Sequence, residues 1–444
     1  MKTLIKDGLA LLDEGGELKI EKRDILIDGN RIAQISSEFN PRMMYQADEI
    51  VDAFGKLVMP GLINAHTHAY MTLFRNYADD QEFFDWLNNV QNVEEGMTEE
   101  DIYWGTMLSA IEMIKSGTTC FVDMNIKSAK EGAMSGPAAA ACGAVVDSGI
   151  RAVISRGLAG TSDSEESICK YGQTIREMDA FKGEERLSFM TGPHAVYSCM
   201  ADYIKKLTQT AKERGIGQTI HLSESEAEME GAARDYGMTP IEYVNSLGVF
   251  DVPVLVAHCV NATAGDIQIM KEKGVSIAIN PKSNMKLGNG FAPVPEFLEA
   301  GINVCLGTDG CGSNNCQNMF QEMNMAALVY KGSHKKARCV DAADVIRMAT
   351  TNAARAIGME GQLGVIREGA LADLIILDLY QPQFFPTNNI LSGLVYSANG
   401  SEVDTVFING RMVMDEGQIL TMNIGKVYTE CERIADRLGM IRKI

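Results

Sequence analysis

Residues 57–68 of the sequence, LVMPGLINAHTH, join a short apolar run to two histidines that are one residue apart, His66 and His68. Alternate side chains of a β-strand point to the same face, so an extended His-x-His segment presents two imidazoles to one metal ion. A histidine pair can also be satisfied by ordinary hydrogen bonds. The metal interpretation therefore depends on whether the rest of the chain supplies further ligands at the same place.

Residues 57 to about 310 alternate short β-branched runs with segments of helical period, which is typical of repeated βα units around a parallel sheet. Some intervening helices carry start and stop signals: a capping-box pattern begins at Thr98, and Gly215 and Gly274 follow helical segments. Eight strands followed by helices predict an α/β fold, a closed (β/α)8 TIM barrel over residues 57–364. The candidate strands are 57–66, 118–124, 151–157, 187–194, 218–224, 252–259, 275–281 and 302–310.

The two ends of the chain have a different pattern. Residues 1–56 and 365–421 alternate apolar and polar positions and contain Asp-Gly, Asn-Gly and Glu-Gly turns, which predict β-hairpins. Two β-rich ends that bracket a barrel pair most simply with each other, so we expect a small β-sandwich domain built from residues 1–56 and 365–444. The last twenty residues are amphipathic and predict a C-terminal helix packed on that domain.

The composition argues against several classes of function. The 444 residues include 40 lysines and arginines against 59 aspartates and glutamates, a net charge of −19 at pH 7. Such a surface repels polyanions, which argues against nucleic acid, an anionic membrane face and a heavily phosphorylated substrate. No window has the pattern of a membrane span, and charges interrupt the start too soon for a signal peptide, so we expect a soluble cytoplasmic protein. The ten cysteines include no C-x-x-C pair and are expected to be free thiols.

Chemically active residues gather at the predicted strand ends. In a barrel of this kind the active site lies at the carboxyl ends of the strands. Five of the six histidines in the chain occupy such ends, and random placement would rarely give this arrangement. The sixth, His334, lies in a polar basic stretch and is interpreted as a surface residue. The strand-end residues are His66, His68, His194, His221, His258 and Asp309.

Four of these residues can form one metal site. Three neutral imidazoles and one carboxylate suit Zn2+ with an open position for water, and the same donor set also suits Fe2+. The fourth predicted strand has no lysine that could bridge two metals, so the pattern favours one metal ion per subunit. The predicted ligands are His66, His68, His221 and Asp309.

Glu224 follows His221 by three residues, in HLSE, and returns a carboxylate to the metal site. A glutamate in this position can move a proton between water and a substrate nitrogen. The alternative is a solvated acidic run, because SESEAEMEG contains further glutamates, but only Glu224 has the required spacing. His258 would act as a base or electrostatic partner beside the metal, and Asp309 would accept a proton.

These residues and their surroundings resemble the amidohydrolase superfamily, and within it the S-adenosylhomocysteine/5′-methylthioadenosine deaminases. The resemblance covers essentially the whole chain. It implies a mononuclear zinc barrel that hydrolyses the C6 amino group of an adenine nucleoside, releases ammonia and leaves an inosine-type product. It also implies a homo-oligomer. The stretches that carry the resemblance are, in chain order, PGLINAHTHAYMTLFRN, the DW of FFDWL, GPHAVYS, HLSE, AHC, NPKSNMKLGNG and LGTDGCGSNN.

The resemblance also implies roles for residues at matching positions. Glu224 would protonate the purine N1, and His258 would orient the attacking water. Glu94 would bind the ribose hydroxyls, with Glu95 as a rival because the loop after Trp86 is about one residue shorter than the family pattern. The other implied substrate contacts are Trp86 in the pocket wall, Arg156 at the 5′ end, and His194 and Ser313 on the nucleoside.

One position departs from the family pattern. Family members that act on S-adenosylhomocysteine have a second arginine about a dozen residues after the one that Arg156 matches, but this chain has Ile168 there. Arg176 could replace it only if the loop is rearranged. A carboxylate clamp built from one arginine is weaker. We therefore expect a small uncharged 5′ group, as in 5′-methylthioadenosine, 5′-deoxyadenosine or adenosine, in preference to S-adenosylhomocysteine.

Two alternatives stay open. The same metal chemistry serves a deaminase or hydrolase of a free purine, a pterin or a triazine ring, because each reaction attacks an electron-poor ring carbon. A non-catalytic binding protein that kept the barrel is expected to have lost at least one ligand, and the sequence lacks none.

Overall fold

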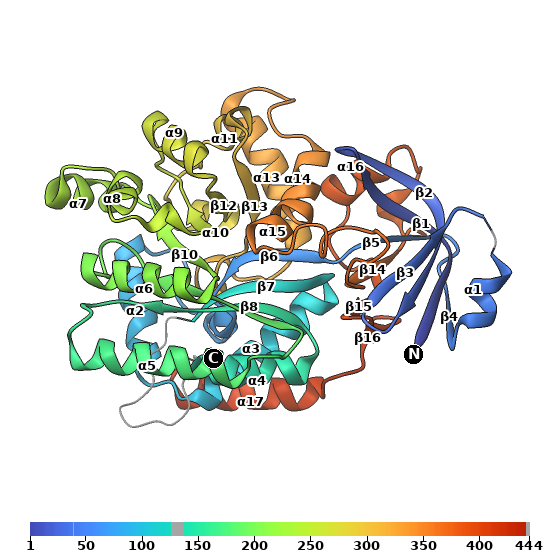
Figure 1. Ribbon diagram of the computed structural model, residues 1–444, viewed down its shortest axis with the longest axis horizontal. Coiled ribbons are helices and arrows are strands. Elements are labelled where there is room, and N and C mark those ends of the chain that lie inside the picture. The colour runs from blue at the N-terminus through green and yellow to red at the C-terminus, as the bar shows by residue number, and fades with distance from the viewer. Residues whose placement is uncertain (39, 126–136, 441–444) are drawn as a thin grey trace.

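The computed structural model describes residues 1–38, 40–125 and 137–440, and its strands form two sheets (Figure 1). One sheet is parallel and eight-stranded, and its strands follow one another in chain order. The eight predicted barrel strands are all present, although the first, predicted at residues 57–66, begins in the barrel only at Leu62. They are β6 (Leu62–Thr67), β7 (Thr118–Asn125), β8 (Arg151–Leu158), β9 (Leu187–Pro193), β10 (Gly217–Leu222), β11 (Val254–His258), β12 (Ser276–Ile279) and β13 (Asn303–Leu306).

The first and last strands of this sheet meet just beyond β13. The backbone N–H of Asp309 donates to the carbonyl of His66 over 2.9 Å, and the N–H of Thr308 donates to Oδ1 of Asn64 over 3.0 Å. These bonds bring the LGTDG segment against the end of β6. The carboxyl ends of the first and last strands therefore lie side by side, as a barrel requires.

Helices cover the outside of the barrel (Figure 1). The capping box predicted at Thr98 is present, with both hydrogen bonds to Asp101, and Gly215 and Gly274 end their helices in the left-handed conformation. The helices are α2 (Phe83–Glu95), α3 (Glu99–Lys115), α4 (Pro137–Ser148), α5 (Glu165–Ala180), α6 (Ala201–Arg214), α7 (Glu226–Tyr236), α8 (Pro240–Ser246), α9 (Ala264–Lys273), α10 (Pro281–Lys286), α11 (Val294–Ala300), α12 (Cys311–Asn314), α13 (Met319–His334), α14 (Ala342–Met348) and α15 (Thr351–Ala356), with 3-10 turns η1 (Ala69–Phe74) and η2 (Val249–Asp251).

The second sheet, here called the terminal sheet, is a nine-stranded mixed sheet built from both ends of the chain, as the hairpin patterns predict. Its central strand β5 pairs parallel with β1 from the N-terminal part and antiparallel with β14 from the C-terminal part. Its strands are β1 (Lys2–Glu14), β2 (Glu17–Asp28), β3 (Arg31–Ser36), β4 (Glu49–Asp52), β5 (Lys56–Pro60), β14 (Leu374–Asp378), β15 (Val403–Ile408), β16 (Arg411–Asp415) and β17 (Gln418–Ile419), and the remaining elements are α1 (Pro41–Gln46), η3 (Pro382–Phe384), α16 (Ile390–Tyr396) and α17 (Ile424–Arg437).

The predicted strand 57–66 is in fact two strands, because β5 belongs to the terminal sheet and β6 to the barrel. The chain passes between them at Gly61. A Cβ on Gly61 would lie 2.1 Å from Oγ1 of Thr119, so only glycine permits this close crossing over β7. The apolar run continues across the break, and for this reason the sequence pattern does not reveal it.

Helix α17 packs on α3 of the barrel, which corrects the expectation that it packs on the terminal sheet. Its buried side chains, Val427, Cys431 and Ile434, share an apolar cluster with Ile102 and Ile111 of α3. Figure 1 shows the helix, in red, running along the barrel below α3 and α4. The amphipathic pattern gives the apolar face but not the surface that this face meets.

Small and apolar side chains fill the interior of the barrel and leave its carboxyl end to polar groups. This inner cluster includes Ile63, Cys120, Val153, Leu255 and Cys305. All ten cysteines are free, as predicted. None of the helices in the described part of the chain is long and apolar enough to cross a bilayer.

Candidate active site

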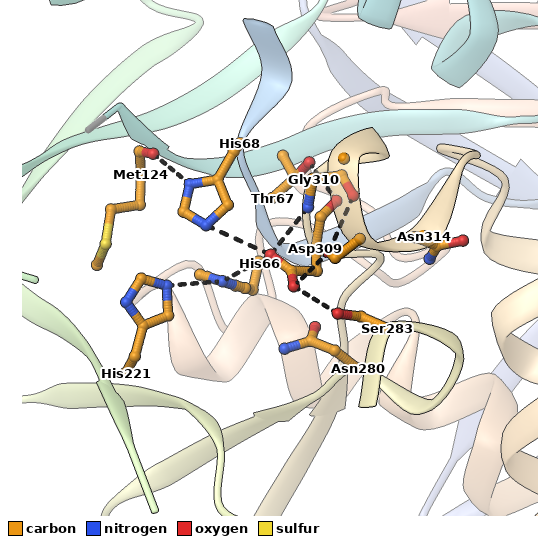
Figure 2. A network of polar contacts seen from close by, with 12 residues as sticks. His66, Thr67, His68, Met124, His221, Asn280, Ser283, Asp309, Gly310 and Asn314 are labelled. Atoms are coloured by element: carbon orange, nitrogen blue, oxygen red, sulfur yellow. Dashed lines mark hydrogen bonds and ion pairs between the residues drawn. The ribbon is translucent and has the colours of Figure 1, made fainter. Parts of the chain in front are cut away.

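Three histidines and an aspartate converge at the carboxyl end of the barrel (Figure 2). Nε2 of His221 lies 3.2 Å from Nε2 of His66. The Asp309 carboxylate oxygen Oδ1 lies 3.3 Å from Nε2 of His68 and 3.6 Å from Nε2 of His66. All four side chains are buried. The structure thus brings together the four residues that the sequence predicts as metal ligands.

Backbone carbonyls determine which nitrogen of two imidazoles carries the hydrogen. Nδ1 of His68 lies 2.5 Å from the carbonyl oxygen of Met124, and Nδ1 of His221 lies 2.9 Å from that of His194. A carbonyl oxygen can only accept a hydrogen bond, so Nδ1 is the donor and Nε2 holds a lone pair. Burial lowers the pKa of His66 to about 4 and that of His221 well below its ordinary value, so both imidazoles are neutral at pH 7.

This arrangement fits a divalent metal. The Nε2 lone pairs of His68 and His221 converge with Nε2 of His66 and a carboxylate oxygen of Asp309, and a cation between them would satisfy all four donor atoms. Ligand atoms of His66, His68 and His221 all lie within 4.8 Å of one another, as do those of His66, His258 and Asp309. Nδ1 of His66 is buried and has no hydrogen-bond partner among the described residues. Nitrogen ligands with one carboxylate suit zinc.

The carboxylate of Asp309 is held from several sides. Oδ2 accepts hydrogen bonds from the hydroxyls of Ser283 (2.6 Å) and Ser313 (2.8 Å), and Oδ1 accepts one from the N–H of Gly310 (2.8 Å). The residue has φ 60°, in the left-handed region, which turns the chain sharply after β13. The hydrogen bonds from neighbouring groups therefore hold the Asp309 carboxylate in place, although its backbone conformation is one that few residues other than glycine adopt.

Two glycines let the LGTDG segment approach β6. A Cβ on Gly307 would lie 2.8 Å from both the Cβ and the carbonyl oxygen of His66, and one on Gly310 would lie 2.6 Å from Sδ of Met71. A larger residue at Gly307 would push the two backbone segments apart, whereas one at Gly310 would first displace the flexible end of Met71 in η1. Gly307 is therefore the glycine required for Asp309 to reach the histidines.

Glu224 and His258 lie beside the four ligands. Oε2 of Glu224 is 3.7 Å from Nε2 of His258, and its Oε1 accepts a hydrogen bond from Asn289 over 3.1 Å. Burial, with the nearby charge of Asp309, raises the pKa of Glu224 well above its ordinary value. Nδ1 of His258 lies 2.9 Å from Oδ1 of Asn284. A buried carboxyl group with a raised pKa is suited to act as a general acid.

One face of helix α2 covers the site. Side chains three and four residues apart along a helix share a face. Trp86 is fastened there by a hydrogen bond from Nε1 to the carbonyl of Gly312 (2.9 Å), and Glu94 accepts one from the hydroxyl of Tyr70. Glu94 lines the cavity, whereas Glu95 is exposed. The α2 residues that line the cavity are Phe83, Trp86, Leu87, Val90, Gln91 and Glu94.

The structure brings most predicted site residues to this cavity. His194 lines it, with its ring centroid 5.0 Å from that of His221. Ser313 is close by but is almost fully buried beneath the site, where its hydroxyl holds Asp309. The predicted residues that line the cavity are His68, Trp86, Glu94, His194, His221, Glu224, His258 and Asp309.

Arg156 is the predicted residue that lies apart from the cavity. Its guanidinium is bonded to Glu177 (2.9 Å) and Gln173 (3.1 Å) of α5, and only 2% of the side chain is exposed. Neighbours two residues away on β8, Ile154 and Leu158, belong to the cluster between the barrel and its helices. Arg156 shares their side of the strand and faces away from the barrel interior.

Several residues near the site were not predicted from the sequence. Tyr197 lines the cavity and packs edge-on against His194, with ring centroids 5.8 Å apart. It lies within the GPHAVYS stretch, and Asn289 lies within NPKSNMKLGNG, so both were in stretches that the sequence had already singled out. Glu228 lies in the first turn of α7, four residues after Glu224, and the acidic run around it conceals its contact with Glu224.

Comparisons with known proteins agree with this geometry. The model of the Amidohydrolase family matches residues 57–413. The chain is 42% identical over 441 residues to a protein of Caldanaerobacter subterraneus subsp. tengcongensis named 5-methylthioadenosine/S-adenosylhomocysteine deaminase, with 99% of each chain covered. It is 41% identical to a protein of the same name from Thermoanaerobacter pseudethanolicus, again with 99% of each chain covered.

Solved structures share the architecture. An adenosine deaminase from Xanthomonas campestris with bound zinc superposes with a TM-score of 0.91 at 27% identity and covers 99% of both chains. An atrazine chlorohydrolase from Arthrobacter aurescens has a TM-score of 0.88 at 22% identity, with 97% of this chain and 99% of that chain covered, a likeness of fold alone. The chain therefore belongs to the amidohydrolase family of hydrolytic enzymes, and within it to the 5-methylthioadenosine/S-adenosylhomocysteine deaminases.

Proposed function

We propose that the protein hydrolytically deaminates the adenine C6 amino group of adenosine-type nucleosides, giving the inosine analogue and ammonia. The observation that carries this proposal is the pairing of Glu224 with His258 directly beside four converging metal ligands. The names of the relatives support the same reaction.

One zinc ion per subunit would be held by the three histidines and the aspartate, and Fe2+ is the alternative metal for the same donors. A divalent metal in this position lowers the pKa of water and so supplies a nucleophile at neutral pH. The ligands would be His66, His68, His221 and Asp309.

The protein's own groups would move the protons. Glu224, whose pKa burial raises, would give a proton to the purine N1, which makes C6 more electrophilic. His258 would orient the attacking water through its Nε2, since Nδ1 is engaged with Asn284. Asp309 would accept a proton from that water. Asp309 would pass this proton to the departing amino group, and Glu224 would regain its own proton from the oxygen added at C6, so that both carboxyl groups return to their starting states.

The cavity wall would recognise the nucleoside. Glu94 would bind the ribose hydroxyls, and Trp86 and His194 would contact the nucleoside, since all three line the cavity. Ser313 would act mainly through Asp309, because its hydroxyl is already committed to that carboxylate.

The 5′ group would be small and uncharged. Arg156, the one arginine that matches the family pattern, is buried in an ion pair with Glu177, and drawing it toward a substrate carboxylate would leave that glutamate unpaired. Position 168 is an isoleucine that is 54% exposed. We therefore favour 5′-methylthioadenosine, 5′-deoxyadenosine and adenosine over S-adenosylhomocysteine.

The deciding experiment follows loss of the adenine absorbance when zinc-loaded protein is added, in parallel, to adenosine, 5′-deoxyadenosine, 5′-methylthioadenosine and S-adenosylhomocysteine. Glu224→Gln keeps the shape of the side chain but removes the acid, and it should lower kcat by about 10²- to 10⁴-fold with metal still bound. Equal efficiency on S-adenosylhomocysteine and 5′-methylthioadenosine would refute the preference at the 5′ end. No turnover on any of the four, with one metal bound per chain, would indicate a free purine, pterin or triazine ring instead.

A further inference from the structure

We propose that Glu228 and Asn261 are positioning residues that together fix the backbone of Glu224. The inference rests on the proposed function, in which Glu224 is the proton carrier. Neither residue lines the cavity, so they would act through Glu224 rather than on the substrate.

The segment that presents Glu224 is bent in an unusual way. Ser223, between the end of β10 and the start of α7, has φ 54°. Few residues other than glycine occupy this left-handed region, and they stay there only when their surroundings hold them. The bend turns Glu224 back over the site instead of letting it continue along the strand direction.

Glu228 holds this bend from the helix side. Its Oε2 accepts the N–H of Glu224 over 2.8 Å. The N-cap hydroxyl of Ser225 accepts the N–H of Glu228 over 3.2 Å and anchors the first turn of α7. Only 5% of Glu228 is exposed, so water does not compete for these bonds.

Asn261 holds Ser223 and Glu224 from the turn after the neighbouring strand β11. Its backbone N–H donates to the carbonyl of Ser223 over 2.9 Å, and its Nδ2 donates to the carbonyl of Glu224 over 3.2 Å. Glu228 and Asn261 therefore engage both backbone polar groups of Glu224 and the carbonyl of Ser223.

Asn261 also links this clamp to His258, which lies three residues earlier in the chain. His258 and Cys259 have φ 77° and 52°, so the chain after β11 makes a second left-handed bend beside the first. The N–H of Cys259 donates to the carbonyl of Leu222 over 3.1 Å. The two bends place the side chains of Glu224 and His258 within 3.7 Å of each other.

The side chain of Glu224 has few supports of its own near the site, namely Asn289 and the ring of His258. Its carboxyl group consequently follows its backbone. A displacement of about 1 Å in a catalytic group can lower a rate by about 10²-fold. A backbone clamp is thus expected to control kcat while it leaves the metal ligands and the α2 wall unchanged.

The test compares Glu228→Ala and Asn261→Ala with Glu226→Gln, a matched control that removes one charge from an exposed position in the same helical turn. Glu228→Ala should lower kcat by about 10- to 100-fold with KM changed by less than about threefold and with metal content unchanged. Glu228→Gln, whose amide oxygen can still accept one N–H, should recover part of the loss and guards against a variant that fails to fold. Glu226→Gln should behave as wild type.

A double-mutant cycle separates positioning from a general effect on the fold. If Glu228 acts through Glu224, then Glu228→Ala should cause no further loss of kcat when it is added to Glu224→Gln. An undiminished additional loss, or a wild-type kcat in Glu228→Ala, would overturn the proposal.

A readout that does not depend on turnover keeps this test distinct from that of the proposed function. Hydrogen exchange at the amide of Glu224 should be faster in Glu228→Ala than in wild type, with the amides of β10 unchanged. Faster exchange with no turnover in wild type would refute the proposed reaction but keep the clamp. Unchanged exchange would refute the clamp.

Discussion

The substitution Gly307→Ala tests whether the close approach of the LGTDG segment to β6 is required for activity. The added Cβ would lie 2.8 Å from the Cβ and carbonyl oxygen of His66 and 2.5 Å from Oδ1 of Asn280. Ordinary contacts at a Cβ are 3.4 Å or longer. His66 would therefore have to retreat by about 0.6 Å, more than the roughly 0.5 Å within which an active site must be held.

The expected effect follows from that displacement. A ligand displaced by roughly 0.6 Å should lower kcat by about 10- to 100-fold, since 1 Å corresponds to about 10²-fold. Metal affinity should fall by a similar factor, because the hydrogen bond from Asp309 to the carbonyl of His66 is strained at the same time. The unfolding free energy should fall by about 1–3 kcal/mol, as is usual for overpacking.

The assay measures kcat on the best nucleoside, zinc content after dialysis, and urea unfolding. Gly332→Ala is the control: Gly332 lies in α13, and a Cβ there would meet no heavy atom within 4 Å. It should keep wild-type activity and gain slightly in stability, because alanine favours a helix. A Gly307→Ala protein with wild-type kcat and zinc content would refute the claim that this contact positions His66.

Three further outcomes are expected. Chelation should abolish turnover and lower the melting temperature, and Zn2+ should restore both; an unchanged melting temperature would contradict a metal held by buried donors. Burial raises the pKa of Asp123 from 3.8 to about 7, so the folded state binds this proton more tightly than the unfolded state does. The unfolding free energy should therefore fall as the pH rises between those two values. In urea titrations, Asp123→Asn should remove up to about 1.4 kcal/mol per pH unit of that pH dependence. Asp373→Ala should lower the unfolding free energy by about 3–5 kcal/mol by leaving Arg151 buried without its carboxylate, whereas Arg355→Ala, which removes an exposed pair with Glu360, should change it by less than about 1 kcal/mol.

The strands and the ligand cluster were predictable for a common physical reason. In a βα barrel, chain order determines which strand ends share a rim, so residue type at each end is enough to bring His66, His221 and Asp309 together before any coordinates are known. Buried parallel strands are also continuous apolar runs, which makes them easy to find.

The errors and omissions arise where contacts across the structure decide the outcome. Nothing in the local pattern shows that Gly61 separates two sheets, because the reason is the proximity of Thr119, far along the chain. The family resemblance implied a substrate contact for Arg156, although Ile154 and Leu158 on the same side of β8 face the helices. The contribution of Glu228 depends on the left-handed bend at Ser223, and a serine in the sequence does not indicate that the backbone is left-handed there.

The hydrogen-bond acceptors that orient His68 and His221 are main-chain carbonyls, and this has a consequence for evolvability. A point substitution at Met124 or His194 changes a side chain but leaves the carbonyl in place. The cavity wall at His194 can thus be altered to admit a new ring or substituent while the imidazole behind it keeps its tautomer. Laboratory selection for a changed substrate can therefore vary residue 194 without second mutations that restore the metal site.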